Sequence, residues 1–226
     1  MTRLRAILFD LDGTLVDTND MHVEAWQRAF REHGHEFTRE QIHSQVGKGG
    51  DNLVPSLLPD ASKEEQDAID ERHGEIYKGE LMPTARPFPS ASDLLRRTRD
   101  EGLKVVLASS AGGEEVDHYV DLLGKELISF TTGKDDVEAS KPCPDIFEAA
   151  LKKGGLKPEE AIVVGDTPYD IQAAKRAGLR CIAVLSGGFP EEELRTAGAV
   201  AIYRDAADLL DHWNELPVAR TADAAP

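Results

Sequence analysis

The chain has 226 residues, of which 40% are hydrophobic and 30% charged, and its formal net charge is −16. This balance is typical of a globular protein with one sizeable core, or a core plus a small accessory domain, and it excludes a largely disordered chain. The negative charge disfavours nucleic acid as a partner, since a phosphate backbone requires clustered Lys and Arg. No apolar run is long enough to cross a bilayer and no signal-peptide pattern opens the chain, so we expect a cytoplasmic protein without a membrane partner.

The N-terminal segment predicts a buried strand that ends in acids. Ala6–Phe9 is a run of apolar residues between Arg5 and Asp10, the pattern of a short strand buried on both faces of a parallel sheet. Asp10 and Asp12 therefore follow the strand end at which open α/β sheets bind ligands. Two buried carboxylates this close repel each other, so they require a cation or a shared proton. A simple Asp-Gly turn at Asp12-Gly13 is the alternative.

The next part of the chain is predicted to contain helices and no strand. The expected helices are Asp20–His33, Thr38–Val46 with Thr38 as N-cap, Asp51–Leu58 and Lys63–Leu81. The stretch 47–50 has three glycines in four residues, which is typical of a loop that approaches another segment closely. Three prolines within 83–89 predict a stiff linker. We therefore expect an all-α insertion at residues 19–83, with residues 1–18 and 84–226 forming the rest.

From about residue 90 onward, helices alternate with short apolar strands, the pattern of a parallel sheet covered by helices. The expected helices are 90–101, 113–123, 145–153, 169–177 and 205–215. The expected strands are 104–108, 128–131, 161–165, 180–185 and an edge strand at 199–203. The chain thus predicts an α/β fold, a doubly wound, Rossmann-like parallel-sheet core with an inserted all-α helical-bundle cap. The small polar tail, 217–226, is expected to fray.

Polar residues follow several of the predicted strands or precede a helix. They are Ser109 and Ser110 after 104–108, Lys141 before 145–153, and Asp166 and Asp170 after 161–165. Helix caps, a solvated lysine and a turn are the structural alternatives. Because parallel strands end at one edge of the sheet, we expect these side chains to converge on Asp10 and Asp12. Carboxylate oxygens suit Mg²⁺, while an ammonium and a hydroxyl suit the phosphoryl oxygens that a metal leaves uncovered.

These residues resemble the four motifs of the haloacid dehalogenase superfamily of phosphohydrolases, over nearly the whole chain. The motifs in order are Asp10-Leu11-Asp12-Gly13-Thr14, Ser109, Lys141 in Ser-Lys-Pro, and the acid pair of Gly165-Asp166-Thr167-Pro168-Tyr169-Asp170. The helical insertion resembles the small α-helical cap of the phosphoglycolate phosphatase and β-phosphoglucomutase group. The resemblance implies a Mg²⁺-dependent hydrolase of small phosphomonoesters.

The resemblance also implies a role for each motif. Asp10 is expected to attack phosphorus and form an aspartyl-phosphate, with Asp12 as acid and then base. The expected metal ligands are Asp10, the backbone carbonyl of Asp12, Asp166 and, through a water or in support of Lys141, Asp170. The expected phosphate-binding groups are Ser109, the backbone amides near Leu11 and Ser110, and Lys141, and Thr14 is also expected to bind the substrate.

Lys48 and His22 are the candidates for contact with the leaving group. By the resemblance, the glycine-rich loop enters the site when the cap closes, and Lys48 then meets an anionic or hydroxylated group. His22 and Trp26 stand in a His-x-x-Ala-Trp pattern seen in sugar-phosphate members. His22 is expected to reach the substrate or Asp12, and packing within the cap is the alternative for His22 and Trp26. A solvated loop lysine is the alternative for Lys48.

Two other functions remain open at this stage. A β-phosphoglucomutase-type enzyme grips a second phosphate with a cap arginine, but residues 47–52 contain no arginine and Gly50 stands near the expected position. A non-catalytic, phospho-accepting receiver module also combines acids, a hydroxyl and a lysine, but the helical cap and Asp12 argue against it. Among substrates, phosphoglycolate, nucleoside monophosphates and sugar phosphates stay open, with sugar phosphates ahead because of His22 and Trp26. The sequence does not indicate an oligomeric state.

Overall fold

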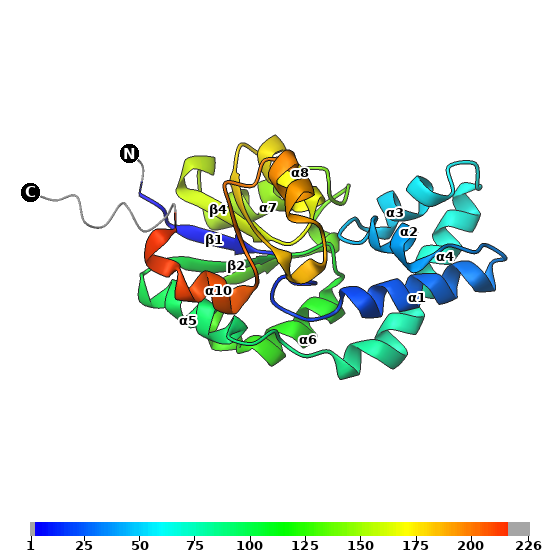
Figure 1. The fold of residues 1–226 in the computed structure, drawn as a ribbon, viewed down its shortest axis with the longest axis horizontal. Coiled ribbons are helices and arrows are strands. Elements are labelled where there is room, and N and C mark those ends of the chain that lie inside the picture. The colour runs from blue at the N-terminus through cyan, green and yellow to red at the C-terminus, as the bar shows by residue number, and fades with distance from the viewer. Residues whose placement is uncertain (1–2, 217–226) are drawn as a thin grey trace, which may run out of the picture.

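A six-stranded parallel sheet organises the computed structural model, which describes residues 3–216 (Figure 1). Its strands are β1 (Ala6–Phe9), β2 (Lys104–Ala108), β3 (Phe130–Thr132), β4 (Ala161–Gly165), β5 (Arg180–Val184) and β6 (Ala201–Tyr203). Their order is β3-β2-β1-β4-β5-β6. The strands β2 and β3 lie on one side of β1, and β4, β5 and β6 lie on its other side, so the order in which strands are added reverses after β3. The predicted doubly wound α/β fold is confirmed, with β6 at an edge. The tail predicted to fray lies outside the described residues.

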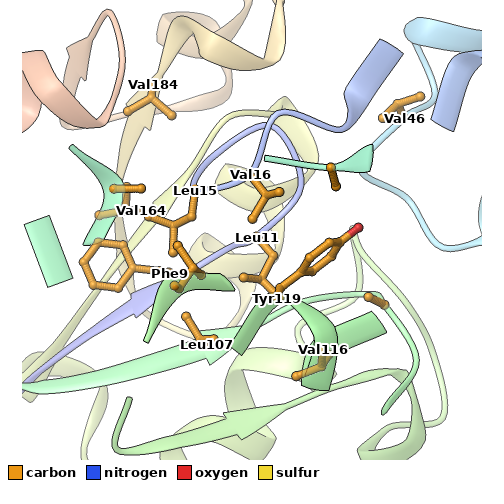
Figure 2. Packing of buried hydrophobic residues seen from close by; sticks show 14 of the residues in the cluster. Phe9, Leu11, Leu15, Val16, Val46, Leu107, Val116, Tyr119, Val164 and Val184 are labelled. Carbon is orange, nitrogen blue, oxygen red and sulfur yellow. The ribbon is translucent and has the colours of Figure 1, made fainter. Parts of the chain in front are cut away.

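Helices cover both faces of the sheet because successive strand residues point to opposite sides. Ile7 and Phe9 of β1 belong to the cluster under α5 (Ala91–Asp100), α6 (Gly113–Leu123) and α10 (Ala206–Asp211). Ala6 and Leu8 belong to the cluster under α7 (Asp145–Gly154), α8 (Pro168–Arg176) and α9 (Glu191–Ala197). Figure 2 shows part of the first cluster, where Phe9 lies beside Val164 and Leu107. All four β1 residues are at most 1% exposed, as predicted for a strand buried on both faces.

Helix α9 (Glu191–Ala197) was not predicted from the sequence. This helix begins with three consecutive glutamates and has a single buried residue, Leu194. Its sequence therefore lacks the apolar periodicity that predicts a helix. In the second half of the chain, the other expected helices are present with boundaries shifted by a few residues. The predicted helix 205–215 is shorter, because α10 ends at Asp211 and a 3₁₀ turn follows at Trp213–Glu215.

The α-helices that lie between β1 and α5 in the chain are found beyond the C-terminal edge of the sheet (Figure 1). They are α1 (Asn19–Glu32), α2 (Arg39–His43), α3 (Gly50–Leu57) and α4 (Lys63–Ile76). Thr38 caps α2 as predicted, since its hydroxyl accepts from the Gln41 amide and the Gln41 side chain accepts from the Thr38 amide. The helix predicted to reach Leu81 changes instead after Ile76 into a π-helical turn, Tyr77–Leu81.

The two chain segments that join these helices to the sheet are paired with each other. The Asp17 amide donates to the Arg86 carbonyl at 2.9 Å, and the Phe88 amide donates to the Leu15 carbonyl at 2.9 Å. The proline-rich stretch is therefore attached to the segment after Asp12. The helices α1 to α4 are thus connected to the sheet by two paired segments, one before α1 and one after α4.

Candidate active site

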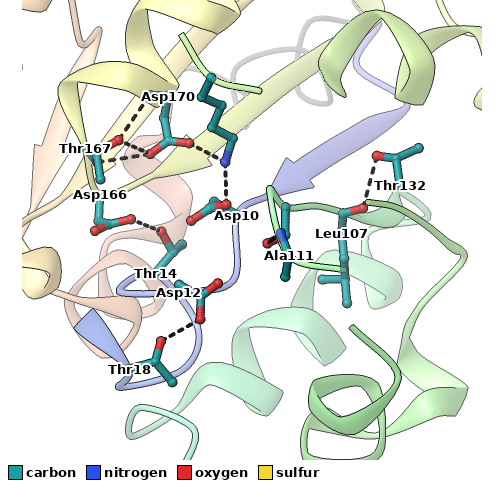
Figure 3. A network of polar contacts seen from close by, with 12 residues as sticks. Asp10, Asp12, Thr14, Thr18, Leu107, Ala111, Thr132, Asp166, Thr167 and Asp170 are labelled. Atoms are coloured by element: carbon teal, nitrogen blue, oxygen red, sulfur yellow. Dashed lines mark hydrogen bonds and ion pairs between the residues drawn. The ribbon is translucent and has the colours of Figure 1, made fainter. Parts of the chain in front are cut away.

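The polar motifs meet at the C-terminal edge of the sheet (Figure 3). Lys141 Nζ lies 2.5 Å from Asp10 Oδ1 and 2.7 Å from Asp170 Oδ1. Lys141 is only 1% exposed, so the alternative of a solvated lysine is wrong. Burial of an ammonium is tolerated here because two carboxylates compensate its charge. Their attraction outweighs the effect of burial and raises the pKa of Lys141.

The start of α8 aims Asp170 at this lysine. Thr167 and Asp170 form a reciprocal cap, in which the Asp170 amide donates to Thr167 Oγ1 at 3.2 Å and Asp170 Oδ2 accepts from the Thr167 amide at 3.0 Å. Asp170 Oδ1 is left free to face Lys141. Gly165 is required by the same geometry, because a Cβ there would lie 2.6 Å from the Asp170 Cβ.

Three buried carboxylates form a site that suits a metal ion. Asp10, Asp166 and Asp170 each offer an oxygen, and these oxygens all lie within 4.8 Å of one another. Burial raises the pKa of Asp10 to about 7 although Lys141 opposes the shift. Burial, together with the charge of Asp170, raises the pKa of Asp166 well above its usual value. One ammonium among three carboxylates leaves negative charge uncompensated, so this hard-oxygen donor set fits a divalent cation such as Mg²⁺.

Asp166 is oriented by two neighbours from the segment after β1. Thr14 Oγ1 donates to Asp166 Oδ1 at 2.8 Å, and Asn19 Nδ2 donates to Asp166 Oδ2 at 2.9 Å. The hydroxyl of Thr14 thus faces Asp166, and Thr14 does not line the cavity in which we expected it to contact substrate. Asn19 was not singled out from the sequence, where an Asn at a helix start indicates only a cap.

Asp12 contacts His22 of the helical insertion. Its Oδ1 accepts from Thr18 Oγ1 at 2.7 Å and lies 3.2 Å from His22 Nε2. Burial opposes ionisation of Asp12, yet the charge and hydrogen bond of His22 hold its pKa below the usual value. The other ring nitrogen of His22 lies 3.2 Å from His73 Nε2, and burial lowers the pKa of His73 well below its usual value. His22 therefore contacts Asp12, the second of its two expected targets.

A cavity of about 500 Å³ opens over these groups and is lined by both the sheet edge and the helical insertion. Ser109 and Ser110 line it at the end of β2, as expected. Ser109 Oγ also accepts from the Ala111 amide at 3.0 Å. The buried Ser110 Oγ has no hydrogen-bond partner within residues 3–216. Trp26 lines the cavity too, but it is 4% exposed and belongs to the hydrophobic core.

Lys48 reaches this cavity from the glycine-rich loop. Its Nζ donates to Gln45 Oε1 at 2.6 Å and to Ser56 Oγ at 3.0 Å, and lies 4.7 Å from the centre of the Tyr169 ring. Because these partners hold the ammonium, it is neither freely solvated nor directed at Asp10. The lining of the cavity carries both signs of charge, with Lys78 and Lys134 among several acids.

Comparison with known proteins agrees with this geometry. A family model described as "Haloacid dehalogenase-like hydrolase" matches residues 7–184, a range that contains all four motifs. The chain belongs to this family. The predicted resemblance is therefore confirmed, and the chain is an enzyme of the hydrolase class.

Two relatives show how far the sequence similarity extends. A phosphoglycolate phosphatase from Aquifex aeolicus is 30% identical over 186 residues, covering 81% of this chain and 86% of that protein. The Arabidopsis thaliana protein "SUPPRESSOR OF QUENCHING 1, chloroplastic" is 34% identical over 216 residues, covering 92% of this chain. The chain spans only 20% of the length of the Arabidopsis protein. Relatives named as phosphatases agree with phosphatase activity.

A solved structure shares the whole architecture. A hydrolase from Pseudomonas syringae superposes with a TM-score of 0.88 at 33% identity, covering 94% of this chain and 99% of that one. Within residues 3–216, no helix combines the length and apolar character that a membrane span needs.

Proposed function

We propose that this hydrolase is a Mg²⁺-dependent phosphatase that cleaves a small phosphomonoester through an aspartyl-phosphate. The observation that carries the proposal is the cluster of Asp10, Asp166 and Asp170 around Lys141 at the base of the cavity. We further propose that residues 19–83 act as a cap, since the cavity is completed by the helical insertion.

The chain supplies a nucleophile and the groups that hold the phosphoryl oxygens. Asp10 and Asp166, with the backbone carbonyl of Asp12, would hold Mg²⁺, and Asp170 would act through a water or through Lys141. When bound, Mg²⁺ supplies positive charge beside the phosphoryl oxygens. An Asp10 oxygen attacks phosphorus, an Asp10–phosphorus bond forms, and the bond to the ester oxygen breaks. Lys141, Ser109 and the free Ser110 hydroxyl stabilise the equatorial oxygens.

Asp12 moves the protons. In the first step it protonates the departing ester oxygen, and in the second it accepts a proton from the water that attacks the aspartyl-phosphate and releases Asp10. The lowered pKa of Asp12 suits the second step. For the first step the proton starts on His22, whose pKa Asp12 raises despite burial, and it passes through Asp12 to the departing ester oxygen.

The cavity supports a leaving group the size of a sugar or a short hydroxy acid. Its volume of about 500 Å³ and its mixture of lysines and acids favour a polar, hydroxylated molecule. Because the Aquifex aeolicus relative is named a phosphoglycolate phosphatase, a phosphoglycolate-like substrate is also a candidate. We therefore propose a sugar phosphate or a phosphoglycolate-like substrate.

The surroundings of Gly50 favour hydrolysis over mutase activity. A Cβ at Gly50 would lie 1.8 Å from Asp70 Oδ1, so an arginine cannot replace this glycine without displacing the acid. A mutase of the β-phosphoglucomutase type would then lack its second phosphate contact at this position. The cavity beside Asp10 and the presence of Asp12 likewise favour an enzyme over a phospho-accepting receiver module.

The test is hydrolysis of p-nitrophenyl phosphate and of a panel of phosphomonoesters, with Mg²⁺ and with excess chelator. We expect release of phosphate only with the metal, and no turnover by Asp10→Asn at unchanged circular dichroism. The panel includes phosphoglycolate, hexose 6-phosphates and nucleoside monophosphates, and glucose 1-phosphate is tested for conversion to the 6-phosphate. Full activity of Asp10→Asn, or full activity in chelator, would refute the proposal.

A further inference from the structure

The segment that carries Lys141 is held from two sides. From the sheet side, Asp145 Oδ2 accepts from the Ala139 amide at 3.2 Å, and Arg176 donates to the Pro142 carbonyl at 2.7 Å. These contacts fix the two ends of the segment. Its middle, Ser140-Lys141, is held by the helical insertion.

Two neighbouring side chains of the cap bond to this middle part. The Ser140 amide donates to Asp51 Oδ2 at 3.1 Å. Asn52 Nδ2 donates to the Ser140 carbonyl at 2.9 Å and to the Lys141 carbonyl at 3.3 Å. Both residues lie in the first turn of α3, so one rigid element presents an acceptor and a donor to the backbone of Ser140-Lys141.

The glycine-rich loop allows this approach. A Cβ at Gly49 would lie 2.2 Å from Ser140 Oγ and 2.6 Å from Ser140 Cβ. A Cβ at Gly47 would lie 2.5 Å from Thr167 Cγ2, next to Asp166. Any larger residue at either position would push the cap away from the two loops that carry Lys141 and Asp166. The glycines therefore allow the cap backbone to contact the loops of the site.

We propose that Asp51 and Asn52 are positioning residues that make the placement of Lys141 depend on a closed cap. The lysine ammonium reaches Asp10 and Asp170 from a backbone whose amide and carbonyls are bonded to α3. When the cap opens, those three hydrogen bonds are lost, and within residues 3–216 the backbone of Ser140-Lys141 keeps only the bond from the Cys143 amide to the Ser140 carbonyl at 3.1 Å. Neither side chain needs to touch the substrate, because both act through the backbone beside Lys141. The proposal rests on the proposed function for the reaction that Lys141 assists.

Asp51 accepts a hydrogen bond from the Lys141 segment, whereas Asn52 donates to it. Substitutions that change only this polarity should therefore give losses of activity that simple loss of packing would not reproduce. Asn52→Ala removes the amide that donates to the two carbonyls and, at 3.3 Å, to Asp51 Oδ2. Asn52→Asp places carboxylate oxygens against the two carbonyl oxygens and against Asp51, so the aspartate variant should be the more damaged. Asp51→Asn keeps an oxygen that accepts from the Ser140 amide, whereas Asp51→Ala does not. The asparagine variant should therefore retain activity that the alanine variant loses.

The matched control is Gln66→Ala. Gln66 Nε2 also donates to two carbonyls, those of Leu58 and Ala61 at 3.2 Å each, but all three residues belong to the helical insertion. Its loss affects the stability of the insertion without reaching Lys141. It should leave turnover of p-nitrophenyl phosphate within about twofold of the wild type, since a hydrogen bond away from the site contributes only to stability.

The measurement is steady-state hydrolysis of p-nitrophenyl phosphate with saturating Mg²⁺. Because Asn52→Ala removes neutral hydrogen bonds to the backbone of Ser140-Lys141, we expect its kcat to fall about tenfold with KM nearly unchanged. A loss in kcat is expected because Lys141 acts on the transition state. Gly49→Ala places a Cβ against Ser140 and so disrupts the same contact between the cap and the Lys141 segment. It should show the same loss in kcat, and it replaces Asn52→Ala if Asn52→Ala does not fold.

A double variant shows whether the effect passes through Lys141. In the Lys141→Met background, Asn52→Ala should cause little further loss, because the group that it positions is gone. The proposal is overturned if the two losses multiply, if Asn52→Asp is as active as the wild type, or if Gln66→Ala loses as much as Asn52→Ala. A wild type that shows no metal-dependent hydrolysis refutes the proposed function instead, so the two failures are distinct.

Discussion

Replacing Asp10 by Asn should abolish turnover and at the same time stabilise the metal-free protein. Burial raises the pKa of Asp10 from 3.8 to about 7. An acid whose pKa is raised on folding binds its proton more tightly in the folded state. The buried acid therefore has no effect on stability at a pH below its pKa in the unfolded chain. As the pH rises towards its pKa in the folded protein, it increasingly lowers the free energy of unfolding.

The size of the effect follows from that shift. A difference of about three pKa units at about 1.4 kcal/mol each gives an upper limit of about 4 kcal/mol at a pH of about 8. Asn carries no charge and so avoids this cost, and Lys141 keeps Asp170 as a partner at 2.7 Å. At about 2–4 °C per kcal/mol for a chain of this size, the melting temperature of Asp10→Asn should exceed that of the wild type by several degrees.

The assay is thermal unfolding in excess chelator at a pH of about 4 and of about 8, where Asp10 is protonated and ionised respectively. The difference between variant and wild type should be small at the lower pH and largest at the higher one. Asp20→Asn is the control, because the side chain of Asp20 is 89% exposed and its surface pair with Arg39 contributes little. A variant less stable than the wild type at the higher pH, or a difference independent of pH, would refute the reasoning.

Three further predictions concern the metal, the cap loop and a buried histidine. Mg²⁺ at about a hundred times its Kd should stabilise the wild type by about 2.7 kcal/mol in thermal unfolding, and this gain should largely disappear in Asp166→Asn. Lys48→Ala should raise KM for the best substrate of the panel while hardly changing kinetics on p-nitrophenyl phosphate; equal losses on both would show that Lys48 does not recognise the leaving group. His73 has a pKa held well below its usual value by burial, so it stays neutral in the folded state while the unfolded chain takes up a proton. Stability should therefore fall as the pH drops below about 6.5, and urea unfolding should show a shallower fall for His73→Gln; identical slopes would contradict this.

The local patterns of the sequence determined most of the secondary structure and the position of the main site groups. The apolar run Ala6–Phe9 can satisfy its backbone and bury its side chains only as a strand within a sheet, and β1 lies at the centre of that sheet. Since parallel strands end at one edge, the acids after β1 and β4 had to approach one another. Lys141 and the acid pair Asp166 and Asp170 were expected there for the same reason.

Some contacts were beyond sequence reasoning because they join segments far apart in the chain. Thr14 and Asn19 bond to Asp166, which is about 150 residues away, and no local pattern distinguishes these bonds from a turn or a helix cap. His73 belongs to a helix of mixed polarity, and only the packing of α4 against α1 brings it to His22. The short helix α9 lacked the periodicity that predicts a helix.

Local sequence patterns were enough to predict which chemical groups are available: buried acids at strand ends, one lysine, two hydroxyls and a flexible glycine-rich loop. Which of these groups contact one another depends on the three-dimensional fold. It directed the Thr14 hydroxyl to Asp166, brought His22 to Asp12, and placed Asp51 and Asn52 on the backbone of Lys141. The physical reason is that periodicity and turn propensity act over a few residues, whereas hydrogen bonds between distant segments depend on how whole helices pack over the edge of the sheet.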